Sequence, residues 1–174
     1  EEVCQKQPFD CDGWVALAEA QKSVAETTPA LEEVALQAAS TSYQAALKIR
    51  ADHSDSIVGL AENQLDIARN KLKVNDSDQE AVALLTQAGE MYFRWLSFNE
   101  TDSVGLYNMA CICALLNRQD ECSQYLVRSI RAEQAAGSDM NQWAQSTAED
   151  VDFKGVVKEE WFQNLLRMAT TPVF

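Results

Sequence analysis

The chain has 174 residues, enough for one domain, and a formal net charge of −13 at pH 7. This charge repels nucleic acid and anionic membranes, and no apolar stretch is long enough to span a bilayer. Only 6 glycines and 3 prolines interrupt the chain, and its apolar residues recur at helical intervals instead of alternating with polar ones. The sequence therefore predicts an all-α protein whose partners are neither nucleic acid nor membrane.

Eight helices are expected, over residues 12–26, 29–50, 55–73, 78–98, 103–117, 119–136, 140–149 and 158–169. Thr28 ahead of Pro29 is typical of a helix start, and Asp55 and Asp102 are N-cap candidates. These helices divide the chain into an N-terminal arm (1–12), three helix hairpins (about 13–51, 55–98 and 103–136) and a capping segment (137–174).

A pattern of large and small residues recurs in the three expected hairpins and predicts how their helices pack. In the third hairpin it comprises Leu106, Met109, Ala110, Cys113, Cys122, Leu126 and Ser129. Weaker copies are Ile57, Leu60, Ala61, Gln64, Ala88, Tyr92 and Trp95 in the second hairpin, and Trp14, Leu17, Ala18, Gln21, Ala39, Tyr43 and Ala46 in the first. Trp95 is large where the pattern expects a small residue.

This pattern, with the run Tyr107-Asn108-Met109-Ala110-Cys111, resembles the tetratricopeptide repeat family. The resemblance implies a right-handed superhelix of antiparallel helix hairpins that presents a protein-binding surface. The gap between the two halves of the pattern is 9 positions in the third hairpin, 18 in the first and 24 in the second. We therefore expect the first two hairpins to be elongated, with projecting tips near Thr27 and residues 74–78.

The stretch Asp150-Val151-Asp152-Phe153, followed by Trp161 and Phe162, resembles the segment that closes many proteins of this kind. The end of a helical array exposes an apolar face that needs a cover. Phe153, Trp161, Phe162 and Leu165 are suited to provide that cover. The alternative is an exposed aromatic patch for a partner.

The resemblance also implies a concave groove lined by the first helix of each hairpin. Its positions fall on Val15, Glu19, Lys22, Val58, Glu62, Leu65, Asp66, Tyr107, Cys111 and Ala114. Chaperone-binding members of the family grip a terminal carboxylate with cations, but residues 103–117 hold no lysine or arginine. Only Asn108 could serve in such a clamp, and it could equally be a structural asparagine. We expect no carboxylate clamp.

The 5 cysteines and the single histidine do not predict a metal site or a cofactor. Cys113 and Cys122 occupy packing positions, where a thiol behaves as a small hydrophobe. Cys4 and Cys11 lie close enough in sequence for a disulfide, and two free thiols are the alternative. His53 is expected to be an exposed turn residue.

Two triplets fit the N-glycosylation pattern, Asn75-Asp76-Ser77 and Asn99-Glu100-Thr101, although such triplets are common by chance. The first residues, Glu1-Glu2-Val3, do not include a methionine. A processed organellar protein, mitochondrial or plastid including the thylakoid lumen, is slightly preferred to a fragment of a cytoplasmic protein.

No nucleophile beside a base and no phosphate-binding glycine loop is evident, so we expect neither an enzyme nor a small-molecule substrate. The preferred hypothesis is a constitutive subunit or assembly factor of a multiprotein complex, because the hairpins are long and Trp95, Phe98 and Phe174 are candidate exposed aromatics. The alternatives are a free adaptor that binds client peptides in its groove and, least favoured, a helical enzyme or thiol-redox protein. The scattered acidic residues favour a solvated surface over a patch that steers a basic partner.

Overall fold

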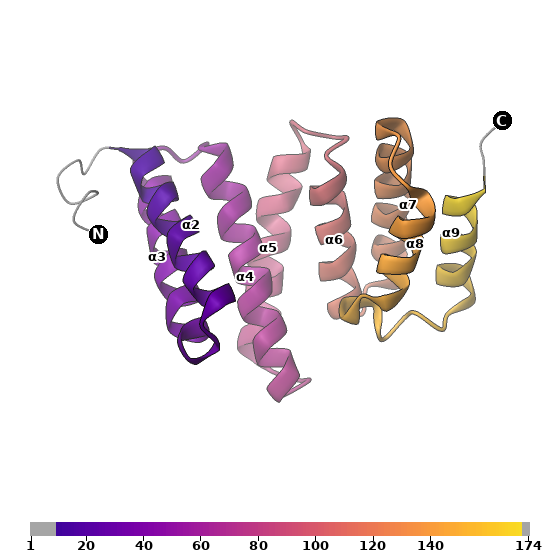
Figure 1. Cartoon of the computed structure of the whole chain (residues 1–174), viewed down its shortest axis with the longest axis horizontal. Helices are drawn as coiled ribbons and strands as arrows, with labels where there is room; N and C mark the ends of the chain where they lie inside the picture. Colours follow the sequence, from indigo (N-terminus) through magenta and orange to yellow (C-terminus); the bar gives the residue numbers. More distant parts are fainter. Residues whose placement is uncertain (1–9, 172–174) are drawn as a thin grey trace. The chain divides into compact units, whose positions relative to one another are not determined.

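The computed structural model describes residues 10–171, which form eight α-helices and two short 3-10 helices, without a strand among them (Figure 1). The elements are α2 (Cys11–Thr27), η1 (Pro29–Leu31), α3 (Glu32–Ile49), α4 (Ser54–Val74), α5 (Gln79–Leu96), α6 (Ser103–Leu115), α7 (Gln119–Ala136), α8 (Met140–Glu149), η2 (Val151–Phe153) and α9 (Glu160–Thr170). The predicted all-α class with about eight helices is confirmed. No helix in the described part of the chain is both long and apolar enough to cross a bilayer.

The chain divides into two compact units, residues 1–91 and 92–174, with the boundary inside α5. We call them unit 1 and unit 2 and describe each by itself.

Side-chain caps fix several helix ends in unit 1. Asp10 Oδ1 accepts a hydrogen bond from the Gly13 amide at the start of α2, and Asp78 Oδ1 accepts one from the Ala81 amide at the start of α5. These bonds satisfy amides that have no partner within the helix. Pro29 begins η1, which leads into α3, so the expected helix 29–50 starts with a 3-10 turn.

Polar contacts show how the helices of unit 1 run. Lys71 Nζ lies 2.8 Å from Glu80 Oε2, and Gln64 Nε2 donates to Gln87 Oε1 at 3.0 Å. Because the later residue of α4 pairs with the earlier residue of α5, the two helices are antiparallel. Lys22 donates to Glu62, 40 positions later in the chain, at 3.1 Å. His53 Nε2 lies 3.1 Å from Oδ1 of Asp12, which is 41 positions earlier. Helices α2 and α4 are therefore parallel.

Two clusters within the core of unit 1 contain alanines that let the helices approach closely. One contains the buried residues Ala18, Ala39, Tyr43 and Leu60, with Val15, Leu47 and Met91 packed against them. The other, nearer the hairpin tips, contains Ala25, Ala35, Leu36 and Ile67, with Leu84 packed against them. This second cluster supports the extra length of α4, which has 21 residues against 13 in α6.

The prediction that His53 is an exposed turn residue is wrong. His53 is the N-cap of α4 and is 4% exposed. Its Nδ1 accepts a hydrogen bond from the Ser56 amide, so the neutral ring carries its proton on Nε2, which lies 3.1 Å from Asp12 Oδ1. The imidazole is buried because its two nitrogens join the starts of α4 and α2.

In unit 2, the large Trp95 lies beside Gly105. A Cβ atom at Gly105 would lie 3.1 Å from Asp102 Oδ2 and 3.3 Å from a Leu96 methyl carbon, which is tight, and 3.4 Å from Trp95 Cδ1, which is ordinary van der Waals contact. Trp95 is half-buried and its Nε1 donates to Asp102 Oδ2 at 2.5 Å, which corrects the expectation that it is an exposed aromatic. Phe98 is 84% exposed, and Phe174 lies outside the described residues.

Aromatic side chains from the end of the chain fill the core of unit 2. The rings of Phe153 and Phe162 lie 5.2 Å apart, and both residues are fully buried against α6 and α7 residues such as Cys111 and Leu126. Leu165 belongs to the same cluster, and Trp161 packs against it. The alternative of an exposed aromatic patch therefore does not hold for Phe153 and Phe162.

Most of the predicted repeat-packing residues are buried. The buried ones are Ala18, Ala39, Tyr43, Ala46, Leu60, Ala61, Ala88, Tyr92, Met109, Ala110, Cys122, Leu126 and Ser129, whereas Trp14, Leu17 and Trp95 are half-buried.

Candidate functional site

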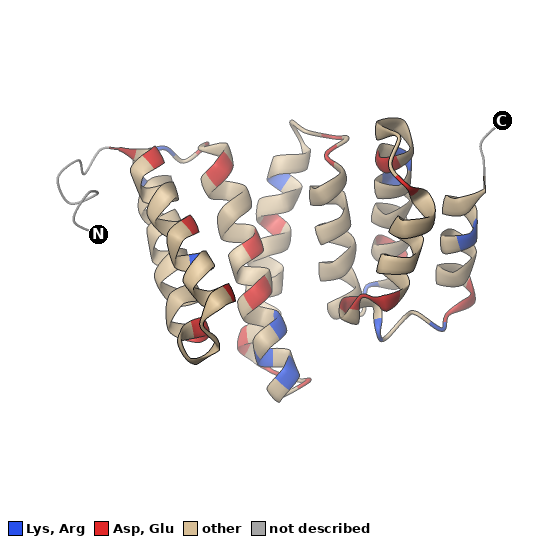
Figure 2. Cartoon of the chain, viewed as in Figure 1, with Lys and Arg blue, Asp and Glu red and all other residues tan. Residues whose placement is uncertain are grey.

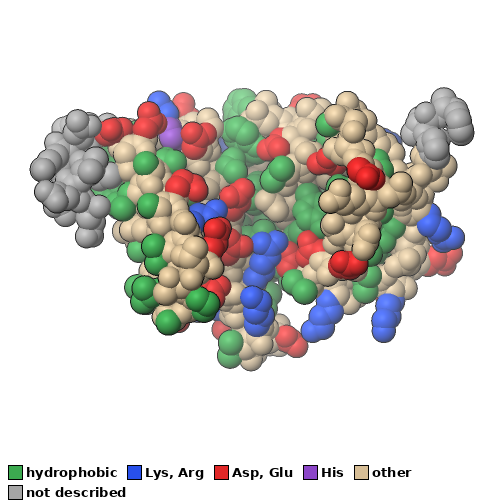
Figure 3. All heavy atoms as spheres, viewed as in Figure 1, with side chains coloured by type: hydrophobic (Ala, Val, Ile, Leu, Met, Phe, Trp, Pro, Cys, Tyr) green, Lys and Arg blue, Asp and Glu red, His purple; other side chains and the backbone are tan. Residues whose placement is uncertain are grey.

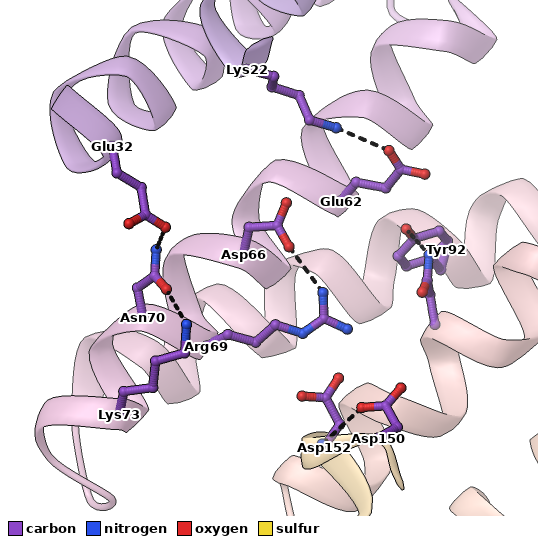
Figure 4. Close-up of polar contacts among 11 residues, drawn as sticks. Lys22, Glu32, Glu62, Asp66, Arg69, Asn70, Lys73, Tyr92, Asp150 and Asp152 are labelled. Carbon is purple, nitrogen blue, oxygen red and sulfur yellow. Dashed lines mark hydrogen bonds and ion pairs between the residues drawn. The ribbon is translucent and has the colours of Figure 1, made fainter. Parts of the chain in front are cut away.

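The groove positions expected in unit 1 lie on α2 and α4, and their charged groups bond one another (Figure 4). Lys22 Nζ lies 3.1 Å from Glu62 Oε2, and Asp66 Oδ1 lies 2.9 Å from Arg69 Nη1. The Tyr43 hydroxyl donates to Glu19 from inside the core, and burial together with this bond raises the pKa of Tyr43 well above its ordinary value. Much of the charge in this face is therefore satisfied within the protein.

Leu65 and Cys111 do not line a groove, which corrects two of the expected positions. Leu65 is 1% exposed and Cys111 is fully buried, so neither side chain can contact a partner. Cys111 is covered because the capping segment contributes Phe153 and Phe162 to the same core cluster. Of the other expected positions, Glu19 is exposed and the rest are half-buried, namely Val15, Lys22, Val58, Glu62, Asp66, Tyr107 and Ala114.

Tyr107 is held by the capping segment. Its ring makes edge-on contacts with Trp143 and Phe153, at 6.1 Å and 5.7 Å between centroids. Its hydroxyl donates to Asp150 Oδ2 at 2.8 Å. Tyr107 therefore has a structural role in unit 2. Asn108 also bonds within unit 2, donating to the Tyr92 hydroxyl at 2.7 Å, so its side chain serves as a structural link.

The cluster of Cys111, Asp150 and Asp152 brings three potential metal-ligand atoms within 4.8 Å of one another. Both Asp150 oxygens, however, accept hydrogen bonds from protein groups, one from the Asp152 amide and one from Tyr107. Asp150 is the N-cap of η2, and this role explains its position without a metal.

The buried thiols are poorly suited to redox or nucleophilic chemistry, which needs the thiolate. Burial raises the pKa of Cys113 to about 11 and that of Cys122 to about 12. The proposed disulfide partner Cys4 lies outside the described residues, so that pairing stays a prediction. The Cys11 thiol is half-buried and lies 3.7 Å from the Ala46 carbonyl oxygen.

A cleft of about 540 Å³ lies in unit 1 where the start of α3 meets the end of α4, and we call it the tip cleft. It is lined by Pro29, Glu32, Glu33, Leu36, Ile67, Asn70, Lys71, Lys73, Val74, Asn75 and Asp78. A second cavity of about 320 Å³ shares Glu32, Leu36, Asn70 and Lys73 with it and adds Ala25, Glu26, Asp66 and Arg69. The gap lengths in the sequence predict projecting tips, but they do not predict a cleft between the helices.

Basic residues of this acidic chain gather in the C-terminal half of α4, beside the tip cleft (Figure 2). Asn70 links two of the charged side chains, because it donates to Glu32 at 2.6 Å and accepts from Lys73 at 2.9 Å (Figure 4). The available signal in the sequence was the run Arg69-Asn70-Lys71-Leu72-Lys73, which is unusual in a chain with a net charge of −13.

Two exposed phenylalanines, one in α5 and one just after its end, are the second candidate contact. Phe93 is 67% exposed and Phe98 is 84% exposed, and we call them the phenylalanine pair. Both belong to unit 2, and only Phe98 was predicted to be exposed. Comparisons with protein-family models and with curated proteins find no match to this chain, so its surfaces carry the functional argument.

Proposed function

We propose that this protein is a non-enzymatic scaffold for protein-protein interaction, built from tetratricopeptide-like helix hairpins, and a constitutive subunit or assembly factor of a larger complex. The observation that carries the proposal is the phenylalanine pair, Phe93 and Phe98. Burying a phenylalanine side chain is worth about 1.5–3 kcal/mol, so a partner that covers both rings gains a substantial part of a stable interface.

The hairpin arrangement of unit 1 supports the repeat interpretation. Helix α3 packs against both α2 and α4, and these two parallel helices also bond each other through residues 40 and 41 positions apart. Repeats of helix hairpins have this kind of spacing, although the tetratricopeptide repeat is somewhat shorter. The extra residues lie at the elongated tips.

A free adaptor that takes client peptides in its groove has less support. Lys22 and Glu62 bond each other in the groove face, and Leu65 and Cys111 are buried. A client would have to displace the Lys22–Glu62 contact and would find fewer exposed side chains than the family pattern implies.

The test is a mild native purification of the tagged chain from its source cells, followed by size-exclusion chromatography and mass spectrometry. We expect a complex of fixed stoichiometry. Replacing the pair, Phe93→Ser with Phe98→Ser, should release the chain, which then elutes near its own mass of 19.3 kDa. A matched control replaces two other exposed apolar residues of unit 2, Val151→Ser with Met168→Ser, and should leave the complex intact.

Elution of the unmodified chain alone would contradict the subunit proposal. Equal release by the control variant would show that the phenylalanine pair is not the contact.

A further inference from the structure

The tip cleft has an apolar floor, formed by Leu36 and Ile67. Both residues line the cleft and are each 5% exposed. Val74, at the end of α4, is 90% exposed beside them. Hydrophobic side chains reach the surface next to charged ones at both hairpin tips (Figure 3). An apolar side chain of suitable length would remove Val74 and the floor from water.

Carboxylates outnumber cations around this floor. The two cavities and the ion pair that borders them contribute Glu26, Glu32, Glu33, Asp66, Asp78 and Glu80, against Arg69, Lys71 and Lys73. The hydrogen bond that Lys71 donates to Glu80 raises the pKa of Lys71, and the nearby charges of Glu80, Asp78 and Glu33 raise it further, while desolvation lowers it by less. The local field therefore favours positive charge.

The three cations already have partners in unit 1. Arg69 bonds Asp66, Lys71 bonds Glu80 and Lys73 bonds Asn70. Glu26 and Glu33, in contrast, form no hydrogen bond or ion pair within residues 10–171. These two carboxylates are available to cations supplied by a partner.

We propose that the tip cleft docks an amphipathic basic segment of a partner protein. An apolar side chain of that segment contacts Leu36, Ile67 and Val74 in the tip cleft. Its lysines or arginines lie against Glu33 of the cleft and Glu26 of the second cavity. An acidic partner would meet the uncompensated carboxylates and is disfavoured. This inference rests on the proposed scaffold function and names the chemistry of a second contact, separate from the phenylalanine pair.

The experiment measures binding of a fluorescein-labelled helical peptide of leucine and lysine to the full chain by fluorescence anisotropy. A matched peptide carries glutamate in place of lysine. We expect the lysine peptide to bind and to weaken as salt is raised, and the glutamate peptide not to bind.

Two variants locate the site. Glu26→Gln with Glu33→Gln should weaken binding of the lysine peptide about five- to tenfold, because each surface ion pair is worth a few-fold in affinity. Val74→Ser should weaken it about threefold or more through lost apolar contact. The control, Glu90→Gln with Glu159→Gln, removes the same charge at two exposed positions that line neither cavity and should bind like the unmodified chain.

Any of three binding results would overturn the inference: no binding of the lysine peptide, equal weakening by the control pair, or equal binding of the glutamate peptide. Self-association of the chain that Val74→Ser abolishes would show that a second copy is the occupant, and would also overturn it. The two proposals can fail separately. A chain that purifies alone from its source cells would contradict the scaffold proposal, yet it could still bind the peptide through Glu26 and Glu33.

Discussion

The ring of Tyr43 lies directly over Gly59. A Cβ atom at position 59 would be 2.4 Å from ring carbons Cε1 and Cζ of Tyr43, far inside van der Waals contact. Tyr43 lies on α3 and is fully buried, and Gly59 lies on α4. The glycine therefore sets how closely these two helices approach.

Gly59→Ala should destabilise the protein even though alanine is the better helix former. Alanine gains up to about 1 kcal/mol in helix propensity, but an overpacked core costs about 1–3 kcal/mol and the buried ring has little room to move. We expect a net loss of about 1 kcal/mol or more in the free energy of unfolding, measured by urea titration. Gly155→Ala is the control, because no atom lies within 4 Å of a Cβ there. Unchanged stability of Gly59→Ala would show that the ring moves aside.

His53→Ala should cost about 1 kcal/mol or more, because it removes the N-cap of α4 and leaves a cavity between α2 and α4. His53→Asn should recover part of this loss, since asparagine is a good N-cap. Asp12→Asn should change little, because the Asp12 side chain is 88% exposed and such contacts contribute weakly. Thermal unfolding of the three variants gives the comparison, and an unaffected His53→Ala would contradict the assigned cap.

The buried thiols predict a loss of stability in alkaline solution. Their pKa values are raised from 9.0 to about 11 for Cys113 and about 12 for Cys122, so the unfolded chain loses these protons first. Their contribution is fully present below about pH 9 and is lost as the pH rises through the folded values. Because lysines and tyrosines titrate in the same range, the measurement is a difference between two proteins. The chain with Cys113→Ala and Cys122→Ala should show a shallower decline than the unmodified chain, and parallel curves would contradict the assignment.

Phe162→Ala and Phe98→Ala form a matched pair in unit 2. Phe162 is fully buried beneath the end of the chain, whereas Phe98 is 84% exposed. The first change should cost about 3–5 kcal/mol by leaving a cavity, and the second should stay within about 0.5 kcal/mol. Chemical denaturation followed by circular dichroism tests both. A large cost for Phe98→Ala would show that this side chain packs within the folded chain and is not available to a partner.

Helix positions were predictable because their signals are local. The 3.6-residue recurrence of apolar residues, Asp102 at the N-cap position of α6 and Pro29 at the start of η1 are signals within a few positions of the chain. The N-cap predicted at Asp55 is wrong, because His53 caps α4 and Asp55 lies inside it. The helices 119–136 and 140–149 were placed at their observed bounds, and the other helices within about two residues at most ends. Burial of Phe153 and Phe162 also followed, because large aromatics at the end of a helical array have an apolar face to cover.

Long-range contacts account for the errors. His53 has the sequence of a turn residue, and only the approach of Asp12, 41 positions away, shows why it is buried. Trp95 departs from the packing pattern, and its indole Nε1 donates to Asp102 Oδ2 beyond the turn that follows α5. Cys111 was assigned to an open groove, and the capping segment covers it.

The sequence by itself determined the all-α class, the order and extent of the helices, and which small residues face their neighbours. These properties depend on helical periodicity and on capping, which a few adjacent residues encode. The tertiary structure decided which side chains are left for a partner: those of the tip cleft with Glu33, those of the second cavity with Glu26, and the phenylalanine pair. Such surfaces exist only after folding. Packing of residues far apart in the chain buries some apolar groups and pairs some charges, and it leaves others exposed.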